Sequence, residues 1–246
     1  MNNKLQELEQ YVDQLWKETF QSEAAKMLEM DAAFKDKRSV AIYLSQVYHY
    51  AVHTPRHQAL VGVNMNNNNF QYMHYCFEHA MEETGHELMA LKDINALGFN
   101  VTADTMPPPL PSTQLLISFL YNEARSENPI HHLGYGFWSE NACPFINDFM
   151  TNLMESMGLE KDQMTFYSGH VTLDESHAKE VREIIKKVVK TEEDWNGLKR
   201  VIKITFDLTI GIVKDMLDAY KELVDNNSED FSIYTEYSRM NEEQTV

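Results

Sequence analysis

Residues that interrupt helices or cross-link a chain are scarce in this sequence. Only 9 of its 246 residues are glycine and 7 are proline, whereas leucine, methionine, glutamate, lysine and alanine are common. Because the common residues are good helix formers, we predict a mostly helical protein. The two cysteines are Cys76 and Cys143, so we expect no disulfide scaffold, and a reducing cytoplasm fits best. One disulfide between them remains compatible with the sequence.

Long apolar runs and basic side chains are also in short supply. No apolar run approaches the ~18 residues of a membrane span, and the polar start MNNKLQELEQ shows no export signal. Lysine and arginine number 21 against 38 aspartates and glutamates, which gives a formal net charge of −17. Because this charge repels phosphate backbones and anionic lipids, we expect neither nucleic acid nor a membrane as a partner. The same charge would concentrate metal cations.

Apolar residues at helical spacing predict a series of helices along the chain. Pro55 should bend or interrupt the second of them, and Gly98 should end the third in a left-handed conformation. We interpret the proline-rich stretch 102–113 as a loop within one domain of residues 1–246, and the polar tail from about residue 226 as loosely held. The helices are expected at residues 5–33 (one or two helices), 40–59, 70–97, 114–124, 131–153, 159–189 and 192–224.

One stripe of the predicted helix 159–189 carries His170, Asp174 and His177. At about 100° per residue, these three side chains fall within roughly 60° of one another around the helix axis. Two imidazoles and a carboxylate form a nitrogen–oxygen ligand set, which suits a divalent transition metal and is typical of a non-haem iron site. The structural alternative is a surface face that happens to hold these residue types.

A second stripe of acids and histidines lies on the predicted helix 70–97. Its members point to one broad side of that helix and are His79, Glu82, Glu83 and His86. Glu140 stands in an apolar, aromatic and small-residue setting, where a carboxylate is costly to bury unless a cation or a hydrogen-bond partner takes up its charge. An exposed Glu140 near the kink expected at Pro144 is the alternative.

A third histidine series, at positions 49, 53 and 57, follows the same four-residue spacing. No acid accompanies it, so we interpret these histidines as packed near a pocket or solvated rather than as metal ligands.

Four segments of the chain together resemble a known family. They are YHYAVHTPR at 48–56, EETGHELMALKDINALG at 82–98, GYGFWSEN at 134–141 and GHVTLDESHAKEV at 169–181. In this order they resemble the haem-oxygenase-like helical fold, and within it the TENA/THI-4-related iron-containing redox enzymes, the haem-oxygenase-like di-iron oxygenases and oxidases. The resemblance implies an all-α domain of about seven helices around a buried metal site.

The resemblance also implies metal ligands from three core helices. Carried over by motif, these ligands are Glu83, His86, Glu140, His170, Asp174 and His177. Some family members place the first acid seven residues before the histidine, where this chain has His79, so His79 and Glu82 stay as alternatives to Glu83. Six candidates favour a pair of iron or manganese ions over zinc, which usually settles for four ligands.

The implied activity is that of a non-haem di-iron oxidase or oxygenase, with two irons per chain and manganese as the alternative metal. Its partners would be dioxygen and a small organic substrate that bears an amine or a carboxylate, and we lean towards a homodimer. The rival interpretations are a metal-free thiaminase-like hydrolase, a cofactorless oxidase of the PqqC type and a non-catalytic interaction protein. The residues that we predict to line the substrate pocket are Phe137, Trp138, Phe166 and Tyr167.

Overall fold

Every regular element is helical in the part of the chain that the computed structural model describes, namely residues 2–22, 32–65, 69–141, 153, 156–225 and 228–235. The α-helices are α1 (Asn2–Gln21), α3 (Lys37–Asn64), α4 (Phe70–Glu82), α5 (Glu87–Ala96), α6 (Pro111–Ala124), α8 (Thr165–Val188) and α9 (Glu192–Val224), and residues 133–141 are also helical. Shorter 3-10 helices are η1 (Ala32–Lys35), η2 (Pro129–His132), η3 (Lys161–Gln163) and η4 (Ser232–Tyr234). Among these helices, none is both long and apolar enough to span a bilayer.

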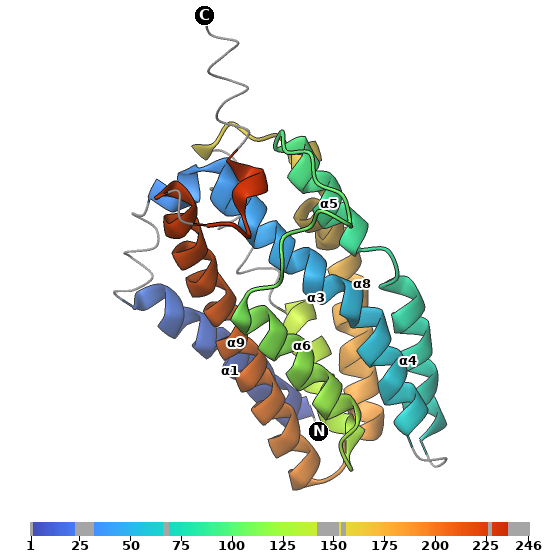
Figure 1. Ribbon diagram of the computed structural model, residues 1–246. Coiled ribbons are helices and arrows are strands. Elements are labelled where there is room, and N and C mark those ends of the chain that lie inside the picture. The colour runs from blue at the N-terminus through green and yellow to red at the C-terminus, as the bar shows by residue number, and fades with distance from the viewer. Residues whose placement is uncertain are drawn as a thin grey trace, which may run out of the picture.

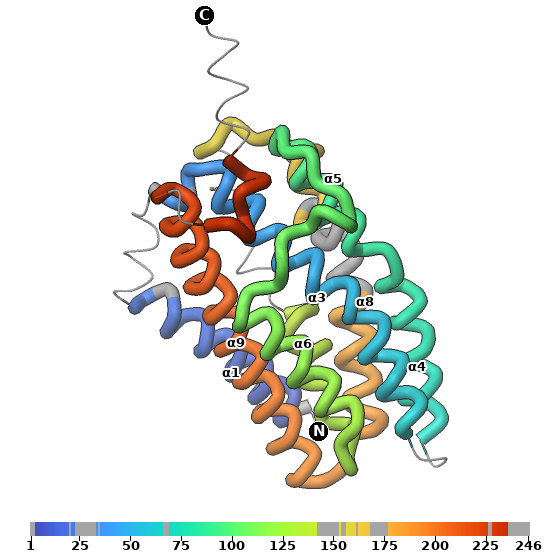
Figure 2. Tube along the Cα trace, in the orientation of Figure 1, coloured from blue at the N-terminus to red at the C-terminus, as the bar shows by residue number. Residues whose placement is uncertain are grey.

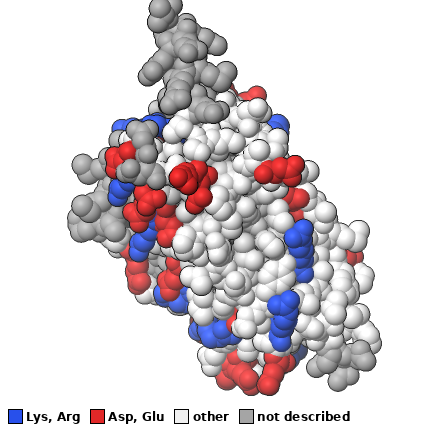
Figure 3. Space-filling view, viewed as in Figure 1, with Lys and Arg blue, Asp and Glu red and all other residues white. Residues whose placement is uncertain are grey.

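Helix α3 runs through the middle of the bundle and contacts α4, α5, α6 and α9 (Figure 1). Its buried residues include the consecutive run Ser39–Ile42, so α3 is covered on every side there, as expected for a central helix. The Cα trace in Figure 2 shows α4 at one edge of the bundle and α1 at the other, where α1 contacts α9. Figure 3 shows acidic side chains gathered at the upper left and the lower end of this face.

Of the bend or interruption predicted at Pro55, the interruption is wrong, because α3 continues unbroken past it to Asn64, and the bend stays a prediction. Proline removes one backbone donor from a helix, at a cost of ~3 kcal/mol. The neighbouring Thr54 hydroxyl donates to the carbonyl of Tyr50, 3.3 Å away. Burial of about half of the residues of α3, between Ser39 and Gly62, stabilises the helix by more than one lost hydrogen bond costs.

The predicted single helix 70–97 is in fact two helices, because α4 ends at Glu82 and α5 begins at Glu87. Gly85 lies between them with a φ of +97°, a left-handed conformation that glycine adopts without strain. Glu83 and His86 therefore lie in the turn between two helices rather than within one helix. Gly98, with a φ of +104°, follows α5 as predicted.

Helix α8 is positioned by a carboxylate from α5. The buried Asp93 accepts hydrogen bonds from the backbone N–H groups of Thr165 at 2.7 Å and Phe166 at 2.8 Å, and from the Thr165 hydroxyl at 2.6 Å. These N–H groups belong to the first turn of α8 and have no partner within the helix. Asp93 therefore anchors the start of the helix that carries His177.

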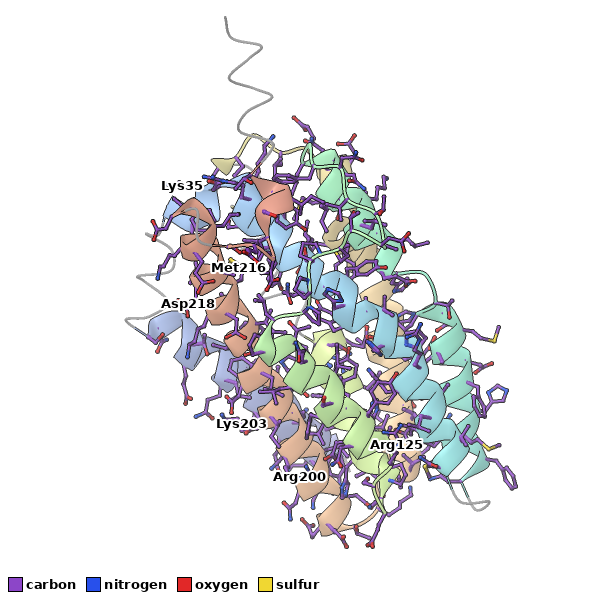
Figure 4. The ribbon with its side chains drawn as sticks, in the orientation of Figure 1. Lys35, Arg125, Arg200, Lys203, Met216 and Asp218 are labelled. Carbon is purple, nitrogen blue, oxygen red and sulfur yellow. The ribbon has the colours of Figure 1, made fainter. Side chains whose placement is uncertain are left out.

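Helices α6 and α9 are joined by an ion pair. Arg200 donates to both carboxylate oxygens of the buried Glu123, at 2.8 and 2.7 Å, and Figure 4 labels Arg200 on the lower half of α9, close to the end of α6. Helix α9 has the predicted bounds, and its start carries a capping box formed by Thr191 and Asp194.

The helical segment 133–141 lies against α9 because of a small residue at its start. A Cβ atom at Gly134 would lie 2.5 Å from the carbonyl oxygen of Leu198 and 2.9 Å from the Cβ of Val201. Only glycine permits this close approach, which explains the first glycine of the GYGFWSEN motif and positions the segment that ends near Glu140.

The expectation of a loosely held tail is wrong for residues 228–235. Phe231 and Tyr234 are buried, and the Tyr234 hydroxyl is hydrogen-bonded to the Ser45 hydroxyl of α3. Residues 236–246 lie outside the described part of the chain. Two aromatic side chains thus hold the start of an otherwise polar tail.

The core consists largely of two apolar clusters at opposite ends of the bundle, which are called lower and upper from their places in Figure 1. The lower cluster includes Leu8, Tyr72, Cys76, Phe137, Val181 and Leu198. The upper cluster includes Ile42, Ala90, Ile94, Met164, Leu223 and Tyr234. Between Cys76 and Ala90 the chain passes from the lower cluster to the upper one, and α8 passes back before Val181. The candidate ligands lie where the chain passes between the two clusters.

Candidate metal centre

Four of the six predicted ligands meet at one place. His177 Nδ1, on α8, lies 3.9 Å from Glu83 Oε1 and 3.8 Å from Glu140 Oε2, and His86 Nδ1 lies 3.1 Å from Glu83 Oε2. His177 is buried, and the side chains of Glu83 and Glu140 are only 12% and 9% exposed. The structure therefore brings together acids and imidazoles from the α4–α5 turn, the segment 133–141 and α8, the three segments from which the family resemblance implied metal ligands.

His79 joins this group from the last turn of α4. One ligand atom from each of His79, Glu83 and His177 lies within 4.8 Å of the other two. Ligand atoms around one metal ion lie ~3–4 Å apart, since metal–ligand bonds measure ~2.0–2.2 Å. A small rotation of these side chains would thus close them on an ion. Both Glu83 and its alternative His79 belong to the group.

An unsatisfied nitrogen supports the fit of a cation. Among the described residues, His79 Nδ1 is buried without a hydrogen-bond partner, and Glu82 Oε2 lies 3.9 Å from it. Buried polar atoms without a partner are rare in proteins, and a bound cation would satisfy this one. Glu82, which is half-exposed, also lies 3.5 Å from His177 Nε2, so all three alternatives for the first acid surround His177.

Two predicted ligands are not located. Helix α8 is regular over the residues that contain His170 and Asp174, but their side chains lie outside the described part of the structure. Their role as ligands therefore stays a prediction.

The residues His79, Glu83, His86, Glu140 and His177 are called the acid–histidine cluster below. Two tyrosines flank it. Tyr75 stacks on His79, with ring centroids 5.4 Å apart and an interplanar angle of 12°. Burial, followed by the charge of Glu140, raises the pKa of Tyr75 well above its usual value. Burial also raises the pKa of Tyr135, as do the charges of Glu83 and Glu140. Both hydroxyls therefore stay neutral beside the carboxylates.

A separate pair of buried histidines was missed by the sequence analysis. His57 Nδ1 and His132 Nε2 lie 2.9 Å apart, both residues are 1% exposed, and His57 Nε2 makes no hydrogen bond. Burial lowers the pKa of His132 to about 3, with a smaller contribution from His79, and burial lowers the pKa of His57 well below its usual value. Because these residues are 75 positions apart, no local pattern could have predicted their contact.

The predicted pocket residues divide between the two apolar clusters. Phe137 and Trp138 belong to the lower cluster, whereas Phe166 and Tyr167 pack against the upper one. The Tyr167 hydroxyl donates to the hydroxyl of Tyr43, at 2.9 Å. The four side chains belong to two different clusters, and their contact with a substrate stays a prediction.

Comparison with known proteins agrees with this arrangement. A family model described as "Iron-containing redox enzyme" matches residues 41–205. A crystal structure of a domain of unknown function with a haem oxygenase-like fold, from Shewanella denitrificans, is 33% identical and superposes with a TM-score of 0.84 over 92% of this chain and 97% of that one. A search of curated proteins found no match.

More distant solved structures share the fold alone. A TenA homologue from P. horikoshii is 14% identical, with a TM-score of 0.67 over 87% of this chain and 97% of that one. A TenA homologue from Pseudomonas syringae is 10% identical, with a TM-score of 0.67 over 87% of this chain and 93% of that one. The predicted all-α, haem-oxygenase-like fold is thereby confirmed. The chain belongs to the family of iron-containing redox enzymes with this fold.

Proposed function

We propose that this protein is a non-haem iron oxidase or oxygenase in which the acid–histidine cluster holds about two irons per chain. The observation that carries the proposal is the convergence of His79, Glu83 and His177 within 4.8 Å, in a chain of an iron-containing redox family. Glu140 and His86 lie in the same cluster. We propose His170 and Asp174 as further ligands.

The chemistry of the donor atoms suits iron or manganese. Imidazole nitrogens and carboxylate oxygens favour these metals, whereas a thiolate set would favour zinc or an iron–sulfur cluster. When bound, iron would supply the redox chemistry by which dioxygen oxidises a small organic substrate that bears an amine or a carboxylate.

The side chains of the protein have distinct tasks in this proposal. Glu83 and Glu140 would offset the charge of the cations, which is why their burial in an acidic protein is tolerated. A hydrogen bond to Glu83 would orient the imidazole of His86. Tyr75 and Tyr135 would exclude water from the acid–histidine cluster. The packing of the two apolar clusters would keep the ligands rigid.

The test is anaerobic reconstitution with ferrous iron, followed by elemental analysis and then exposure to oxygen. Wild type should bind about two irons per chain and show an oxygen-dependent absorbance change. Glu140→Ala and His170→Ala should bind much less iron, while His74→Ala, at an exposed histidine of α4, serves as the matched control. Full iron content in both site variants would contradict the assignment.

The metal-free hydrolase requires a reactive cysteine. Cys76 is a free thiol that is completely buried in the lower cluster, and burial raises its pKa to about 12. Such a thiol is not a nucleophile at neutral pH, so this rival would depend on Cys143, which lies outside the described residues. A metal-free preparation that hydrolyses thiamine would favour the hydrolase over the oxidase.

A further inference from the structure

A groove of about 500 Å³ lies between α4 and α8, outside the acid–histidine cluster. Its volume is within the range of small-molecule sites, roughly 300–1,000 Å³. One stripe of each helix lines it: Phe70, Tyr75 and Glu78 from α4, and Glu180, Glu183 and Lys187 from α8. The mechanism proposed above uses only Tyr75 from this set.

The groove combines negative charge with aromatic surface. Three carboxylates, the ammonium group of Lys187 and the imidazole of His74 line it, and Phe70 in the same lining is 64% exposed. Two of the carboxylates have weak local partners, since Glu78 lies 2.8 Å from His74 and Glu183 lies 2.7 Å from Lys186. Exposed pairs of this kind contribute little to stability, so a bound cation can replace the partner of either carboxylate. Aromatic faces also attract cations.

Tyr75 connects the groove to the acid–histidine cluster. Its side chain lines the groove and stacks on His79. Glu180 in the groove and Glu140 in the cluster both act on Tyr75 by raising its pKa. The Tyr75 ring therefore lies between the groove and His79 of the candidate metal centre.

We infer that this groove binds a small organic cation, in which an ammonium group meets the carboxylates and an apolar or aromatic body lies against Phe70 and Tyr75. This inference deepens the proposed function and rests on it in one respect: the groove is the outer part of the substrate site. Of the two substrate classes proposed above, the charge of the groove favours the amine over the carboxylate. The binding itself requires no metal.

The experiment is an NMR titration of the metal-free, full-length protein with three matched probes: phenethylammonium, 3-phenylpropanoate and 2-phenylethanol. Phenethylammonium should bind about tenfold more tightly than the carboxylate, since several like charges oppose the latter. Its binding should shift the amide signals of residues 70–78 and 180–187 and should weaken as salt is added. Equal binding of the ammonium and the carboxylate, or shifts confined to other helices, would overturn the inference.

Two sets of variants localise the effect. Glu180→Gln combined with Glu183→Gln removes charge at exposed positions of α8, so the variant should fold, and it should weaken phenethylammonium binding about fivefold or more. Glu222→Gln, at an exposed position of α9, should leave binding unchanged. An unaffected double variant would overturn the inference.

Failure of the iron proposal would look different. A protein that binds phenethylammonium through these glutamates but takes up no iron would refute the metal centre while the amine site stands. A protein that takes up iron but does not discriminate among the probes would refute the amine site alone.

Discussion

The two buried histidine clusters of this protein are built from the same side chain but differ in their surroundings. His79, His86 and His177 each have a carboxylate oxygen within 4 Å. His57 and His132 lie against each other, with ring centroids 4.9 Å apart, and against the ring of Tyr135. In the interactions resolved for the described residues, no carboxylate pairs with these last two.

The difference shows that burial alone does not make a histidine a metal ligand. Desolvation disfavours a charged imidazole, and it acts on both clusters. A carboxylate nearby offsets that cost and provides the negative charge that a bound cation requires. Without an acid, the pair is stable only when both rings are neutral, and it satisfies one nitrogen of each ring by bonding internally.

The largest expected effect separates the two clusters by their iron content. His177→Ala and Glu83→Gln should lower the affinity for ferrous iron by more than about a hundredfold, since loss of even an outer partner of a ligand costs ~10–100-fold. His57→Gln, at an equally buried histidine, should keep most of the iron. Elemental analysis after anaerobic loading measures this, with circular dichroism as the check on folding. Equal iron loss in His57→Gln would remove the distinction between the clusters.

Acid should destabilise the protein through the pair that lacks a carboxylate. Both folded-state pKa values are depressed, that of His132 to about 3, whereas a histidine in the unfolded chain titrates near 6.5. Below about pH 6.5 these histidines bind protons in the unfolded state but stay neutral in the folded state. The contribution of the neutral pair to the free energy of unfolding should therefore be complete above pH ~6.5. As the pH drops below that value, the free energy of unfolding should fall by about 1.4 kcal/mol per pH unit for each histidine.

Urea denaturation at a series of pH values measures this dependence. His132→Gln should have a shallower slope than wild type between about pH 6 and pH 4, because one of the two contributing groups is gone. Thr113→Val, at a buried residue without an ionisable side chain, should keep the wild-type slope. If His132→Gln and wild type had the same slope, the pair would not be the source of the acid sensitivity.

A smaller effect is expected at the residue that positions the iron-binding helix. Asp93→Asn should lower the free energy of unfolding by about 1–2 kcal/mol, because an amide caps the two N–H groups of α8 less well than a carboxylate. It should also weaken iron binding modestly, through the placement of His177. Thermal denaturation with Asp162→Asn, at an exposed position of η3, is the control, and equal melting temperatures for the two variants would argue against the capping role.

The smallest effect concerns Tyr135, which lies between the clusters. Tyr135→Phe removes the hydroxyl that is 3.3 Å from Thr54 Oγ1 and should cost about 0.5–1 kcal/mol of stability. Iron content should not change, because the ring still excludes water. A double-mutant cycle with Thr54→Val tests the coupling, and a large loss of iron in Tyr135→Phe would assign the hydroxyl to the metal centre.

The agreement between sequence and structure differs from element to element. Helix α9 has its predicted bounds because its signals are local: an apolar stripe and the capping box at Thr191. The break at Gly85 was not predicted, since a single glycine within a helical pattern is usually tolerated. The effect of Pro55 was overestimated because the packing around α3 compensates for the lost hydrogen bond.

The sequence by itself determined the helical class, the order of most helices and the types and spacing of the acids and histidines, because these depend on neighbours within one or two turns. Only the tertiary structure decided which of those side chains share a place. It joined His79 and Glu83 to His177, and it paired His57 with His132 away from the acids. Contacts between residues this far apart in the chain follow from how the helices pack, and no local pattern encodes them.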